Sequence, residues 1–201
     1  MLVTDIAQIP ESEKKRQPLV ASGVIGILLF IATEIMFFAA LISAYLIIRS
    51  GFPEWPPWGQ PRLPVTTTAF NTFVLLLSGA VLFGANKAFS KSGASQVTKR
   101  LVGISIGLGA FFVLFQGYEW IRLIQFGLTM TSSTYGGVFY LIIGTHGLHV
   151  AIALTVLLYT YYRLNTPRNP RITADGFAVA QIFWYFVVGL WPILYVLVYL
   201  L

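Results

Sequence analysis

Residues 19–48 read LVASGVIGILLFIATEIMFFAALISAYLII, a run of 30 residues that contains a single charged side chain, Glu34. About 20 residues of α-helix cross the hydrocarbon core of a bilayer, so this run is long enough to span a membrane. Lipid offers no partner to backbone N–H and C=O groups, and an α-helix satisfies them within one segment. The run therefore predicts a transmembrane helix.

Four further apolar stretches are also long enough to cross a bilayer as helices, and too long and too little alternating to be barrel strands. They cover about residues 65–86, 101–123, 136–162 and 176–201. The joints between them are polar or rich in Pro and Gly. The sequence therefore predicts an all-α polytopic membrane protein, in which residues 19–201 form a bundle of five transmembrane helices.

The composition excludes several classes of protein. Hydrophobic residues make up 57% of the chain and charged residues 10%, against about 25% charged in an ordinary soluble domain, so neither a soluble globular fold nor a disordered chain fits. The chain has no cysteine, which rules out disulfides, zinc–thiolate sites, iron–sulfur clusters and thiol catalysis.

The basic residues predict the orientation of the helices, since loops rich in Lys and Arg stay in the cytoplasm. Ten of the thirteen bases fall on one side of the predicted membrane, namely Lys14, Lys15, Arg16, Lys87, Lys91, Lys99, Arg100, Arg163, Arg168 and Arg171. The other side has Arg49, Arg62 and Arg122. We expect a cytoplasmic N-terminal segment (residues 1–18) without a cleaved leader, an outside C-terminus in the inner (cytoplasmic) membrane, and no nucleic-acid partner.

Three polar side chains lie at depths where lipid makes them costly, and such groups are functional candidates. Glu34 lies about 22 Å along the first helix and His149 about 20 Å into the oppositely directed fourth helix. His146 is one turn away from His149. We expect the carboxylate to meet one of the two histidines between these helices.

Four functions are open to this group. A buried Glu–His contact that fixes helix packing is favoured, because polar side chains commonly bond across membrane helices. A proton relay is the next alternative, but one Glu with two His is a short chain. A metal site from two His and one Glu lacks a second carboxylate or an HExxH motif. A haem needs ligands from facing helices, and both histidines belong to one helix.

A second pair, Glu119 and Arg122, stands three residues apart near the outer boundary, and we expect an interfacial ion pair there.

Several strings together resemble subunit III of the haem–copper oxidases, the cytochrome c and quinol oxidase family. They run in the family's order from about residue 25 to the end. They are ATEIMFF (32–38), WPP (55–57), NTFVLLLSG (71–79), QGYEW (116–120), YGGVF (135–139), THGLHV (145–150) and FWYF (183–186), with Trp191 and Tyr195 beyond. The chain is similar to the five-helix form, which lacks the first two of seven helices. It departs from the family at Tyr185 and Val188, where the family has His and Asp, and at Thr145, where it has Phe.

The resemblance implies a subunit without a catalytic centre or a bound cofactor, in a proton-pumping complex that reduces dioxygen to water. It implies direct contact with subunit I, which carries haem and copper, and association with subunit II, other respiratory subunits and structural phospholipid. It implies support of proton uptake and of the catalytic subunit's stability. The resemblance does not decide the electron donor, which could be cytochrome c, a quinol or a larger respiratory assembly. The alternatives are an accessory subunit of a nitric-oxide reductase and a stand-alone small transporter or proton channel, although no inverted repeat supports the last.

Overall fold

The computed structural model describes residues 22–166 and 174–201, and these residues form helices joined by loops. The helices are α1 (Ser22–Ser50), α2 (Val65–Ser92), α3 (Gln96–Gln125), α4 (Thr134–Asn165) and α5 (Ala174–Tyr195), and α5 continues as a π-helix, η1 (Val196–Leu200). Each of the helices α1 to α5 is long and apolar enough to cross a membrane. The five-helix prediction is therefore confirmed, whereas the predicted segment 1–18 and the bases Arg168 and Arg171 lie outside the described residues.

The helices extend beyond the predicted apolar stretches at several ends. α2 continues to Ser92 instead of Asn86, and α3 begins at Gln96 instead of Leu101. Hydropathy marks only the part of a helix that lipid surrounds, and the backbone stays helical until a cap stops it. Ser95 supplies such a cap, since its hydroxyl accepts from the Thr98 amide at 3.3 Å.

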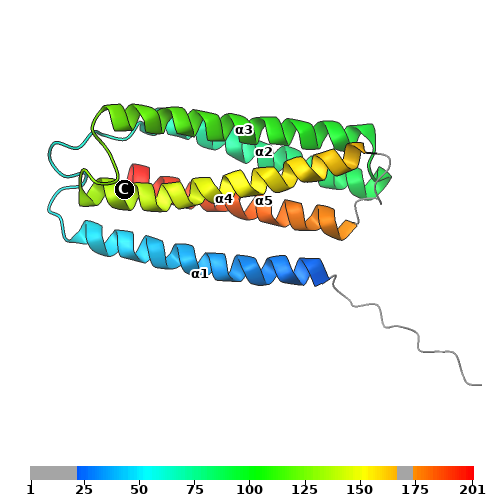
Figure 1. The fold of residues 1–201 in the computed structure, drawn as a ribbon, viewed down its shortest axis with the longest axis horizontal. Helices are drawn as coiled ribbons and strands as arrows, with labels where there is room; N and C mark the ends of the chain where they lie inside the picture. The colour runs from blue at the N-terminus through cyan, green and yellow to red at the C-terminus, as the bar shows by residue number, and fades with distance from the viewer. Residues whose placement is uncertain (1–21, 167–173) are drawn as a thin grey trace, which may run out of the picture.

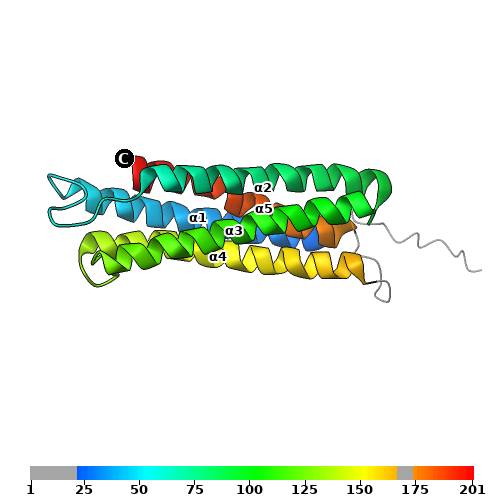
Figure 2. The same cartoon turned by 90° about the horizontal axis from the view of Figure 1, so that it is seen from above.

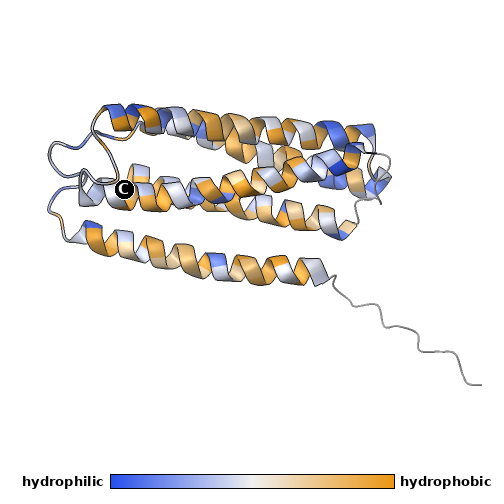
Figure 3. Ribbon diagram, in the orientation of Figure 1, coloured by the Kyte–Doolittle hydropathy of each residue, from blue (hydrophilic) through white to orange (hydrophobic). Residues whose placement is uncertain are grey.

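The bundle is long and its helices lie roughly side by side, with α1 along one edge (Figures 1 and 2). α5 lies in its interior, in contact with α1, α2 and α4. Among the described residues, α1 packs mainly on α4 and α5, and its buried side chains are Phe38 and Tyr45. Hydrophilic residues gather mostly near the ends of the bundle (Figure 3).

Indole–hydroxyl hydrogen bonds join α5 to α2. Trp184 Nε1 donates to Ser78 Oγ at 3.2 Å, and Trp191 Nε1 donates to Thr72 Oγ1 at 2.8 Å. Apolar contact alone gives membrane helices little preference for one another over lipid, so such bonds and close packing decide the arrangement.

Gly109 lets α3 approach the indole of Trp184. A Cβ at Gly109 would stand 2.5 Å from Trp184 Cη2, closer than atoms can approach. The position therefore requires glycine for packing.

Candidate functional site

Glu34 and His149 meet between α1 and α4, near the middle of the bundle. Glu34 Oε2 lies 2.8 Å from His149 Nε2, and the two side chains are 15% and 13% exposed. The structure thus brings together two of the three residues singled out in the sequence.

The second ring nitrogen of His149 decides the chemistry of this contact. His149 Nδ1 lies 2.8 Å from the carbonyl oxygen of Thr145, four residues earlier in α4. A carbonyl oxygen only accepts, so Nδ1 carries hydrogen and Nε2 faces the carboxyl group. The 2.8 Å separation of Nε2 and Oε2 is that of an ion pair wherever Nε2 also carries hydrogen.

Phe38 packs over this pair from α1. Its ring centroid lies 5.3 Å from that of His149 and 6.4 Å from that of Phe186 on α5, and its side chain is 1% exposed. The phenyl ring keeps the Glu34–His149 contact in an apolar environment, where hydrogen bonds are electrostatically stronger than in water.

His146 does not share the Glu34 contact. It is 0% exposed and stacks on Trp191 of α5, with ring centroids 5.1 Å apart. Neither of its ring nitrogens has a hydrogen-bond partner within the described segments. Three residues turn a helix by about 300°, so side chains one turn apart diverge by about 60°. That divergence directs His149 toward α1 and His146 toward α5.

The structure does not bring together Glu119 and Arg122, for which an interfacial ion pair was expected. Glu119 is 3% exposed and belongs to the interior, whereas Arg122 is exposed with its guanidinium 5.9 Å from the centre of the Tyr118 ring. Within the part of the chain that the structure describes, no salt bridge joins them. The same divergence of side chains one turn apart explains the separation.

Sequence reasoning missed a buried polar cluster beside Glu119. Asn71 Nδ2 donates to the Phe112 carbonyl at 3.2 Å and lies 3.5 Å from Gln116 Oε1, and Gln116 Nε2 donates to the Tyr199 hydroxyl at 3.2 Å. The available signal was the presence of two amides, Asn71 and Gln116, within apolar helices.

Val188 and Tyr185, two of the three departures from the family pattern, differ in surroundings. Val188 is buried and packs on Gly79 of α2, where a Cβ would lie 3.2 Å from Val188 Cγ1. Tyr185 lines an apolar groove of about 470 Å³ between α1 and α5, together with Phe38 and Phe186. The Tyr185 hydroxyl has no hydrogen-bond partner among residues 22–166 and 174–201.

The family model described as "Cytochrome c oxidase subunit III" matches residues 2–201. The chain is 34% identical over 177 residues to cytochrome c oxidase subunit 3 of Synechocystis sp., covering 88% of this chain and 74% of that one. It is 32% identical to the Thermostichus vulcanus protein of that name, covering 89% and 87%. It is 33% identical to a probable cytochrome c oxidase subunit 3 of Mycobacterium leprae, covering 87% and 86%.

Proposed function

The chain belongs to the cytochrome c oxidase subunit III family, and we propose that it packs directly against the haem-bearing subunit I of a terminal oxidase. It is an accessory subunit of a respiratory complex rather than a stand-alone transporter, and a nitric-oxide reductase is not favoured. The match of the family model over residues 2–201 is the observation that carries this conclusion.

In this proposal the chain itself binds neither haem nor copper. Its histidines share one helix, His149 is occupied by Glu34 and the Thr145 carbonyl, and His146 is enclosed against Trp191. Axial haem ligands must stand across the ring from each other, usually on facing helices. The redox chemistry therefore belongs to partner subunits.

Glu34 and His149 hold α1 onto the rest of the bundle at mid-membrane. α1 buries few side chains, so this polar contact is a large part of its attachment. Retention of α1 lets the subunit present a continuous surface to the complex, which is how it supports the catalytic subunit and proton uptake.

Phospholipid occupies the groove between α1 and α5 in this proposal. The groove is lined by apolar side chains such as Ile35, Ile42 and Ile193, at the depth of acyl chains. An acyl chain matches this apolar lining, although it offers no hydrogen bond to the Tyr185 hydroxyl.

The orientation follows the basic residues, with the N-terminus in the cytoplasm and the C-terminus outside the cytoplasmic membrane. Lys87, Lys91, Lys99 and Arg100 all lie at the ends of α2 and α3 that join through Gly93. That end of the bundle therefore faces the cytoplasm.

Deletion of the gene for this chain tests the function, with the full-length chain restored as the control. We expect membranes without the chain to lose dioxygen consumption progressively during turnover, and restoration to recover it. Nitric-oxide consumption measured in the same membranes distinguishes the reductase alternative. Unchanged dioxygen consumption with loss of nitric-oxide consumption would overturn the proposal.

A further inference from the structure

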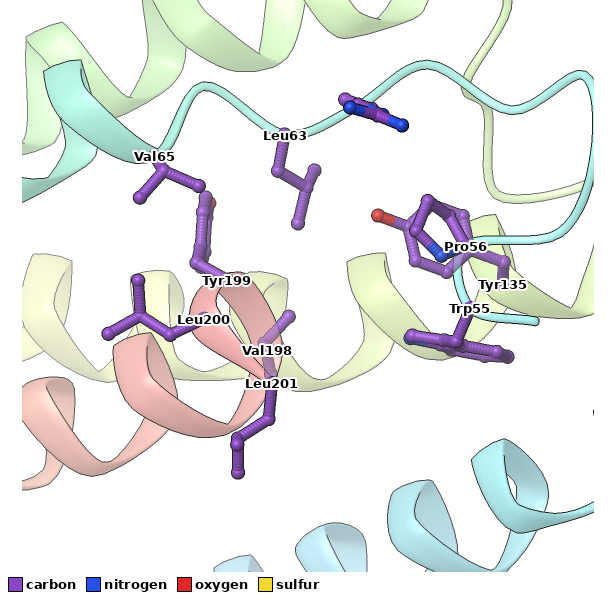
Figure 4. A pocket seen from close by; sticks show the side chains of 10 residues that line it. Trp55, Pro56, Leu63, Val65, Tyr135, Val198, Tyr199, Leu200 and Leu201 are labelled. Carbon is purple, nitrogen blue, oxygen red and sulfur yellow. The ribbon is translucent and has the colours of Figure 1, made fainter.

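A pocket of about 240 Å³ opens at the end of the bundle where α1 ends and α2 begins. Trp55 and Pro56, from the loop between these helices, line one side of it, and Val198 and Tyr199 of η1 line the facing side (Figure 4). These aromatic and apolar side chains shield part of the pocket from bulk water. A charged group inside it therefore interacts more strongly with a ligand than it would in water.

Two polar groups of this pocket have no partner within the described segments. The Tyr135 side chain is 2% exposed, and its hydroxyl, which no hydrogen bond among those residues involves, is directed into the pocket (Figure 4). Arg62 is exposed and also lines the pocket, and no salt bridge or hydrogen bond in the described part of the chain holds its guanidinium. The pocket therefore presents N–H and O–H donors that lack acceptors.

The other polar side chains at the pocket are already bonded within the protein. Trp55 Nε1 donates to the Tyr45 hydroxyl at 3.0 Å, and the Tyr199 hydroxyl accepts from Gln116 Nε2 at 3.2 Å. A ligand in the pocket therefore meets the two unpartnered donors and otherwise apolar or aromatic surface.

No acidic side chain lines the pocket among the residues that the structure describes. Glu54 lines a neighbouring cavity together with Arg62 but forms no salt bridge with it. Arg49 donates to the carbonyl of Leu201, whose side chain lines the pocket. Of these two arginines, Arg62 is thus the one whose guanidinium is available to an anion.

We propose that this pocket binds the phosphate group of a ligand, held by the Arg62 guanidinium and the Tyr135 hydroxyl. An arginine fork takes two oxygens of an anion side by side, and a phosphate then has a further oxygen for a third donor such as Tyr135. Helix ends and exposed tryptophans such as Trp58 are typical of the headgroup level of a membrane, so a phospholipid or free phosphate can supply this group. The site is separate from the groove between α1 and α5 and does not depend on the function proposed above.

Protection of a thiol in the pocket wall tests the binding. Leu200→Cys places a thiol at an exposed position of the wall, and Ser132→Cys, exposed in the loop between α3 and α4, is the matched control. The protein is purified from membranes in mild detergent together with its partners, and loosely bound lipid is removed. Labelling of this chain, which has no native cysteine, by a charged thiol reagent is then followed over time. The probes are inorganic phosphate, phosphatidylglycerol, and diacylglycerol, which lacks phosphate.

We expect a phosphate-bearing probe to slow the labelling of Leu200→Cys and to leave that of Ser132→Cys unchanged. Protection by inorganic phosphate as well as by phosphatidylglycerol supports a site for free phosphate, and protection by phosphatidylglycerol alone supports a headgroup site. Equal protection by diacylglycerol, or none by either phosphate-bearing probe, would overturn the proposal. A Leu200→Cys thiol that stays unlabelled before any probe is added would also overturn it, because a partner subunit then covers the pocket.

Substitutions in the Leu200→Cys background assign the donors. Arg62→Gln, at an exposed position, should weaken probe binding by about tenfold or more, because hydrogen bonds to charged groups are the strong ones. Tyr135→Phe removes one neutral donor and should weaken binding by about threefold. Arg122→Gln is the matched control, since it removes an exposed arginine that lies beside Tyr118 instead of in the pocket. Equal effects of Arg62→Gln and Arg122→Gln would show unspecific attraction of charge and contradict the site.

Discussion

Glu34 Oε2 and His149 Nε2 lie 2.8 Å apart between α1 and α4, and the other nitrogen of His149 faces the Thr145 carbonyl. The carbonyl orients the ring so that Nε2 faces the carboxyl group. A carboxyl group that would be costly alone in lipid thereby stands against one histidine.

Two substitutions of Glu34 distinguish the effect of its charge from the effect of its hydrogen bonding. Glu34→Gln retains a polar partner for His149, so we expect normal assembly and largely preserved dioxygen reduction. Glu34→Leu leaves His149 Nε2 unpaired and destabilises α1 packing by about 1–3 kcal/mol. The measurement is retention of the subunit in the complex under increasing detergent, alongside oxygen uptake. Loss of turnover in an assembled Glu34→Gln complex would show an obligatory proton path instead.

The two histidines provide a matched comparison one turn apart on α4. His146 stacks on Trp191 without a polar partner among the described residues, so His146→Phe should leave subunit retention nearly unchanged. His149→Phe removes the partner of Glu34 and should weaken retention as Glu34→Leu does. Equal effects of the two substitutions would contradict the assignment of different roles.

Gly109 is expected to tolerate no side chain. Gly109→Ala places a methyl group against Trp184, and overpacking of this kind costs about 1–3 kcal/mol. Gly107→Ala, at a position with nothing within 4 Å of the added Cβ, is the control on the same helix. Thermal unfolding of the purified complex measures both, and a lower melting temperature is expected only for Gly109→Ala.

Restoring the family's acidic residue should harm this chain. Val188 is 6% exposed and packs against Gly79, so Val188→Asp buries a carboxyl group beside apolar atoms. An unpaired buried charge costs several kcal/mol, and we expect poor assembly. Val188→Ala measures the loss of packing alone. Assembly as good with Asp as with Ala would mean that a polar partner is available.

Much of this architecture could be predicted from the sequence, because lipid imposes helices on any long apolar stretch. Residues 19–48 predicted α1, and the depths of Glu34 and His149 predicted their meeting. The direction in which each side chain leaves its helix could not be predicted. His146 was grouped with His149, and Glu119 with Arg122, because each pair is one helical turn apart. In the structure the two side chains of each pair point to different surroundings.

The π-helix η1 also escaped prediction, because no apolar periodicity distinguishes it from the end of α5. Its consequence is large, since η1 places Tyr199 against Gln116 in the buried cluster. Pro192 lies in α5 just before it and cannot donate a backbone hydrogen bond, which was the nearest available signal.

The orientation of the bundle is tested at the turn between α2 and α3. Ser92→Cys should be labelled by an impermeant thiol reagent only in inside-out vesicles, because basic residues surround that turn. Ser132→Cys, in the loop between α3 and α4, should be labelled only in right-side-out vesicles. The reverse pattern would invert the proposed topology.

Affinity purification through a tag on this chain tests the central claim most directly. In gentle detergent, we predict that the chain brings down a haem-bearing partner, with a Soret band and dioxygen consumption in the purified material. After the subunits are separated, the Soret absorption should stay with the partner, and this chain should show no Soret absorption. Purification of the chain alone, or with haem bound to it, would contradict the account.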